Sequence, residues 1–493
     1  MIAGVGSGVP AASHAATRPP VVMLVFDEFP VGDLMLGNGK IDADRFPGFA
    51  SLASGSTWFR NASTVYDSTV KAAPAILDGR LPRAGTSPSY RSHPRSIFTF
   101  MDRLGYRIRS REEATTVCPP RLCPRVNHYG NPHYSILHQR RERLGRTIAS
   151  LRRSSRPTFT FHHSVLPHVP WVYLPSGRAR TGYSPGTLPD FASPKGFSNE
   201  FLTAFNEQRH LLQVGYVDRE VGKLVRRLKQ TGQWKRALVV VTADHGISFQ
   251  RSFAYNVADR RAVNERNVED IAPVPLFVKG PGQTRGRIAN AYAETTDILP
   301  TVAHLLGAPL GFAVDGTQAY GETVRDRDGV TIQRRDLSGS IYVDAKEIEA
   351  RRRLQTRRRA ALFGNGPWSR VYRIGANRGL LGRSVATLPG VGAGAVRATF
   401  SVPRSLARVR RSAKAVPTLA AGAITGGGAL SDRPLALAVN GRIAAVGRSF
   451  HFKVEPREYF ALNLPESRLR DGRNSMQLYE VVGANTLVPL GSR

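Results

Sequence analysis

The chain contains 493 residues, of which 41% are hydrophobic and 22% are charged, and this composition excludes a wholly disordered, collagen-like or coiled-coil protein. At roughly 100–200 residues per domain, the length allows two to four domains. Lysine and arginine outnumber aspartate and glutamate by 70 to 37, which gives a formal net charge of +33. Such a surface attracts polyanions, so nucleic acid bound without sequence preference, anionic lipid and anionic wall polymer are all candidate partners.

Residues 1–20 are rich in small side chains but lack a basic start and a continuous apolar run, so we expect a flexible leader rather than a signal peptide. No stretch of the sequence approaches the ~18 consecutive apolar residues of a membrane-spanning helix. The two cysteines, Cys118 and Cys123, lie in a proline-containing loop that one disulfide could close, and two free thiols are the alternative. A disulfide would indicate an oxidising compartment outside the cytosol.

Short apolar runs alternate with helical patterns over residues 21–310, which predicts an α/β domain with a largely parallel sheet flanked by helices. Runs that predict buried strands cover residues 21–26, 158–161, 237–242 and 274–278. Apolar side chains recur at helical spacing over residues 211–228, and a second helix over residues 297–306 should end at Gly307.

The arginine-rich segment 344–362 predicts an exposed helix in which Glu347 and Glu349 pair with Arg351 and Arg353 four residues on. An anion-binding strip is the alternative interpretation of the same arginines. From about residue 395 the pattern changes to short strands.

Asn440-Gly441 between two apolar runs is a typical two-residue hairpin turn. We therefore expect a small C-terminal β domain, which either recognises a carbohydrate or covers a flank of the core. The expected organisation is a leader over 1–20, a catalytic domain over 21–340, a basic helical linker over 341–394 and the β domain over 395–493.

Acids and histidines follow three of the predicted strands: Asp27 follows the first, His162 and His168 the second, and Asp244 and His245 the third. Ligands of open α/β sheets bind beyond the carboxyl ends of the strands, so we expect these side chains to share one rim. Carboxylate and imidazole together suit Zn²⁺ or Mn²⁺, whereas an all-oxygen site would suit Mg²⁺ or Ca²⁺. Singly, each acid could be a helix cap and each histidine a loop residue, so the hypothesis depends on their common placement.

A nucleophile is expected in the segment YDSTVKAAPAILDGRLP, where Ser68 and Thr69 precede a helix of small residues. A hydroxyl at a helix N-terminus lies near free backbone N–H groups and the positive end of the helix dipole, where a phosphate or sulfate would also bind. Ser and Thr are also the preferred helix caps, and from this segment alone an ordinary helix cap is the better interpretation.

The order of these segments resembles the alkaline phosphatase superfamily, and in particular its sulfatase branch, over about residues 20–310. The resemblance rests on VVMLVFDEF, the helix that ends in LDGRLP, LPHVPW, VVVTADHG, VPLFVKGPG and TTDILPTVAHLLG, in that order. In sulfatases the nucleophile lies ten residues before the glycine that closes the helix. Counting back from Gly79 therefore implies Thr69, with Ser68 as the alternative. The Cys/Ser-x-Pro-x-Arg motif that yields formylglycine is absent, because the chain has Thr-Val-Lys-Ala-Ala here.

A threonine nucleophile resembles the lipoteichoic acid synthases and the phosphoethanolamine transferases, which act through a phosphothreonine intermediate. The resemblance implies one divalent metal ion held by Asp27, Thr69, Asp244 and His245. The first acid of those relatives is commonly glutamate, so Glu28 is the alternative to Asp27.

Further roles follow for three cationic or titratable side chains. His168 would protonate the leaving oxygen or bind the substrate phosphate, with His162 as second choice, and Lys71 would help to hold the charged phosphate oxygens. The Asp-x-x-x-His pair of two-metal phosphodiesterases is not matched by His210 and Asp218, which have neither its order nor its spacing. One metal is therefore expected.

We thus predict a metal-dependent hydrolase or transferase of phosphate esters, of the phosphodiester or phosphoglycerol type, that acts through a phosphothreonine. A sulfatase-like sulfuric ester hydrolase without formylglycine is one alternative, and a non-catalytic protein that binds polyanions is another. The substrate would be an anionic phosphate or sulfate ester, lipid-linked or part of a wall polymer. We expect an extracytoplasmic location, with attachment to the membrane in a longer form of the chain.

Overall fold

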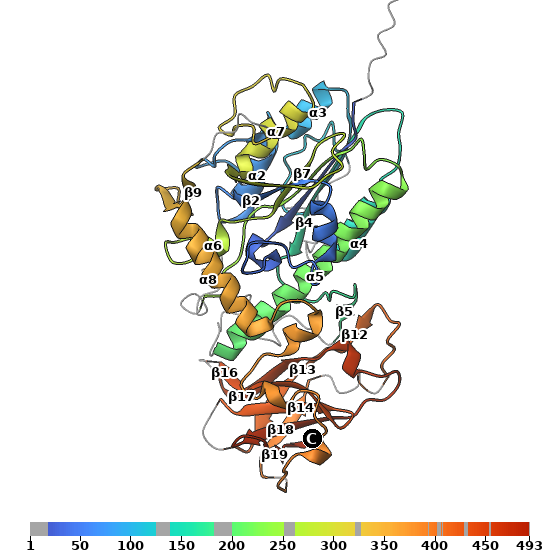
Figure 1. Ribbon diagram of the computed structural model, residues 1–493, viewed down its shortest axis with the longest axis vertical. Helices are drawn as coiled ribbons and strands as arrows, with labels where there is room; N and C mark the ends of the chain where they lie inside the picture. The colour runs from blue at the N-terminus through green and yellow to red at the C-terminus, as the bar shows by residue number, and fades with distance from the viewer. Residues whose placement is uncertain are drawn as a thin grey trace, which may run out of the picture.

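The structure is a computed structural model that describes residues 18–124, 139–181, 200–250, 262–320, 327–392, 394–401, 406, 408–427, 432–452 and 455–492. An α/β part with a central sheet lies at one end of the long axis, and a part made mostly of β-strands lies at the other (Figure 1). The predicted α/β class, a largely parallel central sheet flanked by helices with additional C-terminal β structure, is confirmed.

The central sheet has seven strands. In spatial order they are β3 (Arg107–Glu112), β4 (Thr158–Pro167), β1 (Val21–Asp27), β6 (Leu238–Ala243), β7 (Leu276–Lys279), β2 (Thr57–Ser63) and β8 (Arg287–Glu294). β7 runs antiparallel to both of its neighbours, and the other neighbouring pairs are parallel. Every residue of β1, β4, β6 and β7 is buried, as expected for strands that helices cover on both faces.

The helices are α1 (Pro47–Ala53), α2 (Thr69–Asp78), α3 (Ile97–Arg103), α4 (Arg140–Ala149), α5 (Glu200–Gln230), α6 (Val268–Ile271), α7 (Ile298–Leu305) and α8 (Ala345–Phe363). Short 3₁₀ turns are η1 (Val31–Leu34), η4 (Thr295–Asp297), η5 (Trp368–Tyr372), η6 (Arg378–Leu380), η7 (Val385–Thr387) and η9 (Glu466–Arg468). Alternate residues of β1 point to opposite faces of the sheet, so Met23 and Val25 pack with α2, α3 and α7, whereas Leu24 and Phe26 pack with α1, α4 and α5. The predicted helix over 211–228 lies within α5, and Gly307 follows α7 with a left-handed φ of 60°.

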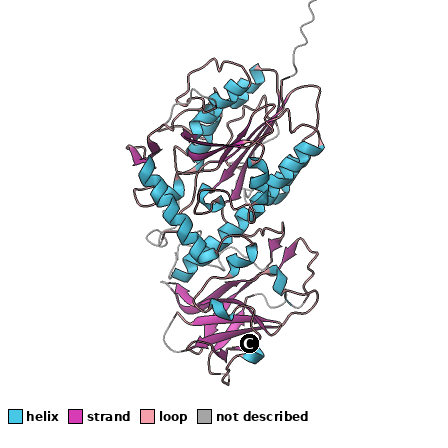
Figure 2. Ribbon diagram, in the orientation of Figure 1, coloured by secondary structure: helices cyan, strands magenta, loops and turns pink. Residues whose placement is uncertain are grey.

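Two antiparallel sheets form the C-terminal β structure (Figure 2). The five-stranded sheet contains β16 (Phe450–Phe452), β17 (Glu455–Asn463), β13 (Leu419–Thr425), β11 (Arg397–Phe400) and β20 (Gly491–Ser492), of which β20 runs parallel to β11. The four-stranded sheet contains β15 (Arg442–Arg448), β14 (Pro434–Val439), β18 (Met476–Val482) and β19 (Thr486–Pro489). Asn440 and Gly441 form the predicted hairpin turn with φ values of 51° and 76°.

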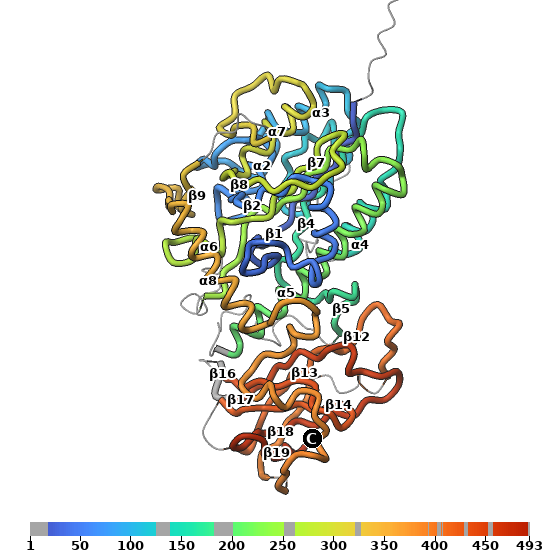
Figure 3. The backbone as a smooth tube through the Cα atoms, viewed as in Figure 1, coloured from blue at the N-terminus to red at the C-terminus, as the bar shows by residue number. Residues whose placement is uncertain are grey.

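The two parts of the molecule are joined by the pairing of two short strands and by a shared hydrophobic core. β5 (Ala179–Arg180) of the α/β part pairs with β12 (Ala415–Val416), and one cluster of buried side chains runs from the α5 face of the central sheet into both C-terminal sheets. The path of the chain through this junction can be followed in Figure 3. A hairpin of β9 (Gly329–Gln333) and β10 (Ser340–Asp344) precedes α8, so the expected boundary at residue 340 falls within β10.

Helix α8 contains the two predicted ion pairs but is not exposed on all sides. Glu347 pairs with Arg351, and Glu349 accepts from Arg353 at 2.7 Å. In contrast, Arg359 is buried on the other side of the helix. The helix therefore has the expected charged, exposed face, but a second face that includes Arg359 is buried.

Arg359 pairs with two buried carboxylates that lie far away in the sequence. Its guanidinium is 2.7 Å from Asp33 in η1 and 2.9 Å from Glu207 in α5. These acids need a buried cation, since an unpaired charge inside a protein is costly.

The predicted disulfide between Cys118 and Cys123 is present. Glu112, at the end of β3, accepts the backbone N–H groups of Val117 and Cys118 and so holds the start of this loop against the sheet. Within the described residues, no helix combines the length and the apolar character that crossing a membrane requires.

Candidate active site

Asp27 ends β1 at the carboxyl edge of the central sheet, and the residue is 3% exposed. The next residue, Glu28, has a positive φ of 59°, so the chain turns sharply directly after the strand. Asp27 therefore faces the space beyond β6, whereas Glu28 points away from it toward His168, with 3.5 Å between Oε1 and the imidazole Nε2. Of the two acids considered for the metal, the structure places Asp27 in the cluster.

Thr69 is the first residue of α2, and the extended residue Ser68 precedes the helix without a capping hydrogen bond from its side chain. The helix ends at Gly79, which has a left-handed φ of 69°. The Thr69 hydroxyl lies 3.4 Å from Oδ1 of Asp27 and 3.3 Å from Nε2 of His245. Of the two hydroxyls considered, the structure thus brings Thr69 to the rim.

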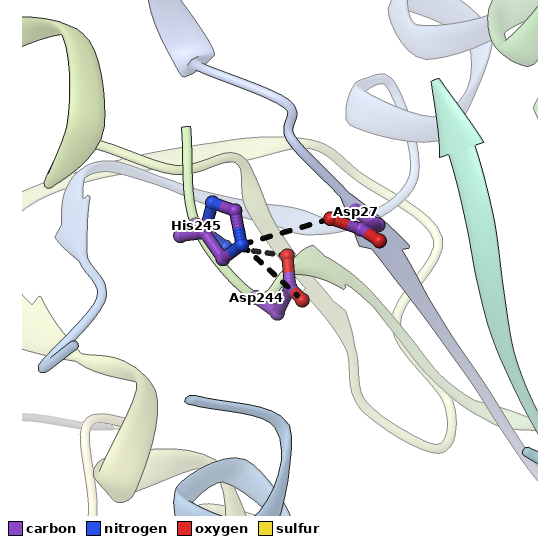
Figure 4. Close-up of side chains that lie close together, drawn as sticks. All are labelled: Asp27, Asp244 and His245. Atoms are coloured by element: carbon purple, nitrogen blue, oxygen red, sulfur yellow. Dashed lines mark hydrogen bonds and ion pairs between the residues drawn. The ribbon is translucent and has the colours of Figure 1, made fainter. Parts of the chain in front are cut away.

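Asp244 and His245 follow β6 and complete the cluster (Figure 4). The backbone carbonyl of Gly246 can only accept a hydrogen bond, so the His245 Nδ1 atom that lies 2.8 Å from it carries the proton. The Nε2 lone pair of His245 is therefore directed at the cluster, 3.6 Å from Oδ1 of Asp27 and 3.9 Å from Oδ2 of Asp244.

Gly246 allows this turn because the chain passes close to another segment. A Cβ atom at residue 246 would lie 2.1 Å from the backbone oxygen of Asp270, and the N–H of Gly246 donates to the carbonyl of Ile271 at 2.8 Å. A larger residue would push the His245 turn away from α6. This contact explains the glycine of the VVVTADHG segment.

The residues of the cluster fit a divalent cation. One ligand atom from each of Asp27, Asp244 and His245 lies within 4.8 Å of the other two, and all three side chains are buried. Among the described residues, Oδ2 of Asp244 has no hydrogen-bond donor within reach. Burial alone would raise the pKa of Asp244, but the nearby His245 and His163 imidazoles and the Thr69 hydroxyl outweigh it and lower this pKa. Two buried carboxylates beside an imidazole nitrogen are a donor set typical of Mn²⁺ or Zn²⁺.

His163 lies at the cluster and His162 does not. Nε2 of His163 is 3.7 Å from Oδ2 of Asp244, whereas His162 turns to the opposite face of β4. There its Nε2 is 3.0 Å from Glu113 and its Nδ1 is 2.8 Å from Thr147. Successive residues of a strand point to opposite faces, so only one of the two histidines can reach the site.

The sequence contains a signal that would have selected His163. Phe159 and Phe161 pack with α3 on the same face of the sheet as Val25, and His163 follows them at the strand period of two. His163 is thus a site residue that the sequence reasoning did not single out.

His168 lies beside the cluster rather than in it. Its Nδ1 atom is 2.8 Å from the carbonyl of Val169, which fixes the proton on Nδ1 and directs Nε2 at Glu28. The side chain is 17% exposed, so solvent and substrate can reach it.

The structure does not bring Lys71 to the cluster. Its ammonium donates to the carbonyls of Arg83 and Thr86, at 2.6 and 3.0 Å, and to the Thr86 hydroxyl at 2.9 Å. All three hydrogens of the ammonium are satisfied by this loop.

His210 and Asp218, which failed the two-metal pattern, have structural contacts. His210 donates from Nε2 to the carbonyl of Glu28 at 2.9 Å and so supports the turn after Asp27. Asp218 accepts the N–H groups of Gly48 and Phe49 at the start of α1, and its burial raises its pKa to about 6.

The family-model match places the chain in the alkaline phosphatase superfamily, whose members are hydrolases and transferases of phosphate or sulfate esters and use divalent metal ions. The family model described as Sulfatase matches residues 19–308, which is more than half of the chain, and the chain belongs to this family. The resemblance inferred from the sequence is confirmed.

Individual relatives are distant. The chain is 29% identical over 102 residues to the multifunctional alkaline phosphatase superfamily protein PehA of Trinickia caryophylli, which is 20% of this chain and 18% of PehA. It is 25% identical over 135 residues to lipoteichoic acid synthase of Staphylococcus aureus, which is 26% of this chain and 21% of the synthase. The matches thus span about a fifth of each relative. Among solved structures, the phosphonate monoester hydrolase SpPMH from Silicibacter pomeroyi is 18% identical with a TM-score of 0.41, over 64% of this chain and 79% of that one.

Proposed function

We propose that the protein is a metal-dependent hydrolase or transferase of phosphate esters, of the phosphodiester or phosphoglycerol type, and that Thr69 carries the phosphoryl group as a covalent intermediate. The observation that carries this proposal is the position of the Thr69 hydroxyl. It is the first side chain of α2 and lies within 3.4 Å of both Asp27 and His245. A hydroxyl in that place combines a helix N-terminus, which stabilises anions, with a set of cation ligands.

Asp27, Thr69, Asp244 and His245 would hold the ion. When bound, a divalent ion would lower the pKa of the threonine hydroxyl and offset negative charge on the transferred group. The proton of the hydroxyl points to Oδ1 of Asp27, so that carboxylate can accept it as the oxygen attacks.

The first step forms a bond between Oγ1 of Thr69 and phosphorus and breaks the bond from phosphorus to the leaving oxygen. His168, which lies beside the cluster and is 17% exposed, would give that oxygen a proton after turning Nε2 away from Glu28, and Glu28, 3.5 Å away, would stabilise the protonated imidazole before the transfer. In the second step a water or an alcohol attacks phosphorus and gives its proton to His168, the bond to Thr69 breaks, and the proton held by Asp27 returns to the Thr69 oxygen to restore the hydroxyl. Water makes the protein a hydrolase and an alcohol makes it a transferase.

The test is a burst experiment with bis(p-nitrophenyl) phosphate and Mn²⁺. The wild-type chain should release one equivalent of p-nitrophenol before steady state, and the peptide that contains Thr69 should carry the added mass. Thr69→Ala should lose the burst and at least about a thousandfold in turnover, because no other group replaces a nucleophile. Thr69→Ser is the matched control and should keep a burst. Turnover by Thr69→Ala at the wild-type rate would refute the intermediate.

A sulfuric ester hydrolase without formylglycine is the second candidate, and the match to the Sulfatase family model favours it. Phosphodiesters and sulfate monoesters both present one negative charge on a tetrahedral centre. Comparing kcat/KM for p-nitrophenyl sulfate with that for bis(p-nitrophenyl) phosphate separates the two. A higher value for the sulfate would replace our first proposal.

The disulfide between Cys118 and Cys123 supports an extracytoplasmic location, because such bonds persist in oxidising compartments. A substrate that is lipid-linked or part of a wall polymer would be found there. Thiol labelling of the protein from its native compartment tests this, since a reduced pair would contradict the location.

A further inference from the structure

A groove of about 920 Å³ runs along β3, the edge strand of the central sheet. Its walls come from β3, from α4 and from the segment after α4. Six arginines line it, which are Arg107, Arg109 and Arg111 of β3, Arg143 and Arg146 of α4, and Arg152.

The two glutamates in the wall of the groove hold neighbouring parts of the protein. Glu112 accepts the N–H groups of Val117 and Cys118, and Glu113 accepts from Arg143 and from His162. Because Arg143 is buried against Glu113, the positive charge of the groove comes from the other five arginines.

The three arginines of β3 form a regular row. They alternate with Ile108 and Ser110, and Ile108 packs into the core on the α3 side of the sheet. Side chains two residues apart on a strand point the same way and lie about 6.6 Å from each other. Burial together with the charges of Arg107 and Arg152 lowers the pKa of Arg109, as expected where like charges are held close. A row of evenly spaced cations matches a linear chain of evenly spaced anions.

The groove lies behind β4 with respect to the candidate active site. Thr147 lines the groove and contacts His162, whereas His163 faces Asp244 from the opposite side of the strand. A ligand in the groove therefore does not occupy the site of Thr69.

We propose that this groove binds a linear polyanion whose units each carry one tetrahedral anion, a phosphodiester or a sulfate ester, and no nucleobase. The flat guanidinium group donates two parallel hydrogen bonds to such an anion. Grooves that bind single-stranded nucleic acid without sequence preference also offer exposed aromatic rings for the bases. Among the described residues of this groove, the one aromatic side chain is Phe161, which is 1% exposed and belongs to the core. The proposal goes beyond the reaction at Thr69 and does not depend on it.

The experiment measures binding by fluorescence anisotropy with the full chain at several salt concentrations. The probes are labelled long-chain polyphosphate, labelled dextran sulfate and a labelled thymidine oligonucleotide. The test variant is Arg107→Gln/Arg109→Gln/Arg111→Gln, in which neutral side chains replace three cations. We expect its Kd for the preferred polymer to rise at least about tenfold. The slope of log K against log salt should fall by about 2, since each lost contact with a flexible chain removes ~0.7.

The matched control is Arg285→Gln/Arg287→Gln/Arg357→Gln, which removes the same charge from exposed positions at the opposite edge strand and on α8. Its slope should stay unchanged. Equal losses in the two triple variants would show that net charge alone binds polymer, and would overturn the groove. Tighter binding of the oligonucleotide than of both polymers would replace our ligand class with nucleic acid, and absence of binding would refute the site.

Preference for polyphosphate or for dextran sulfate tells the phosphate source from the sulfate source, and either supports the groove. If the glutamine variant does not fold, lysine at the same three positions keeps the charge and loses the paired hydrogen bonds. That variant should weaken binding about threefold at an unchanged salt slope. Turnover of bis(p-nitrophenyl) phosphate should be unaffected in every groove variant, so failure of this proposal and failure of the Thr69 mechanism remain distinguishable.

Discussion

The buried carboxylate of Glu113 makes the stability of the protein depend on pH in a way that can be measured. It accepts hydrogen bonds from Arg143 at 2.7 Å, from the N–H of Val165 at 3.0 Å and from His162 at 3.0 Å. Burial alone would raise its pKa, but His162 and Arg143 lower it from 4.5 to about 2. Since the pKa is lower in the folded chain than in the unfolded chain, ionised Glu113 stabilises the fold above pH 4.5. This contribution is lost as the pH falls toward 2.

The two pKa values differ by about 2.5 units, and each unit corresponds to ~1.36 kcal/mol. Ionised Glu113 therefore adds about 3 kcal/mol to the free energy of unfolding at pH 7, of which about 1 kcal/mol remains at pH 3. Glu113→Gln removes the charge and keeps an acceptor. The variant should therefore be about 3 kcal/mol less stable than the wild type at pH 7 but only about 1 kcal/mol less stable at pH 3. Urea unfolding followed by circular dichroism at the two pH values gives both differences.

Glu265→Gln is the matched control, because Glu265 pairs with Arg334 on the surface. An exposed pair contributes at most about 1 kcal/mol, so this variant should differ little from the wild type at either pH. A Glu113→Gln deficit that is the same at pH 7 and pH 3 would refute the reasoning, because it would come from lost packing rather than from ionisation.

Three further predictions concern the site and α1. Gly246→Ala should destabilise the chain by about 1–3 kcal/mol in urea unfolding, because the new Cβ meets the carbonyl of Asp270 and displaces His245. The variant should also show no Mn²⁺ binding in calorimetry, and an unchanged metal affinity would contradict the prediction. Asp27→Asn should raise the melting temperature of the chelator-treated protein, because it removes one of two buried like charges. It should also lose the stabilisation by Mn²⁺, and a retained Mn²⁺ effect in thermal melts would exclude Asp27 as a ligand. Burial raises the pKa of Asp218 to about 6, so ionisation of Asp218 weakens the fold as the pH rises from 4 to 6. Asp218→Asn should therefore lose less stability between pH 4 and pH 7 than the wild type does, and parallel pH profiles of urea unfolding would disprove this prediction.

The residues that the structure brings together at the rim are those for which the sequence contains two independent signals. Asp27, Asp244 and His245 each follow a fully apolar run, and such runs are strands whose carboxyl ends meet at one edge. Thr69 begins a helix with a glycine stop, so both its element and its place in that element could be predicted.

Side-chain direction was harder to predict than position along the chain. The sequence places both His162 and His163 near the end of β4, but the face that each one occupies depends on the register of the strand. Lys71 is close to Thr69 in sequence, yet it points to the loop that contains Thr86. The burial of Arg359 depends on partners in other elements, and no local pattern in α8 reveals them.

The ion pairs of Arg359 bear on how this protein can be divided. A polypeptide that stopped before α8 would retain the carboxylates of Asp33 and Glu207 in its interior and would lack their shared cation. Asp33 lies in the turn just beyond Asp27, so the disturbance would begin close to the candidate active site. The α/β part therefore cannot be separated from the rest of the protein at the end of the central sheet without loss of these ion pairs. A truncated form that keeps the candidate site intact would have to include α8.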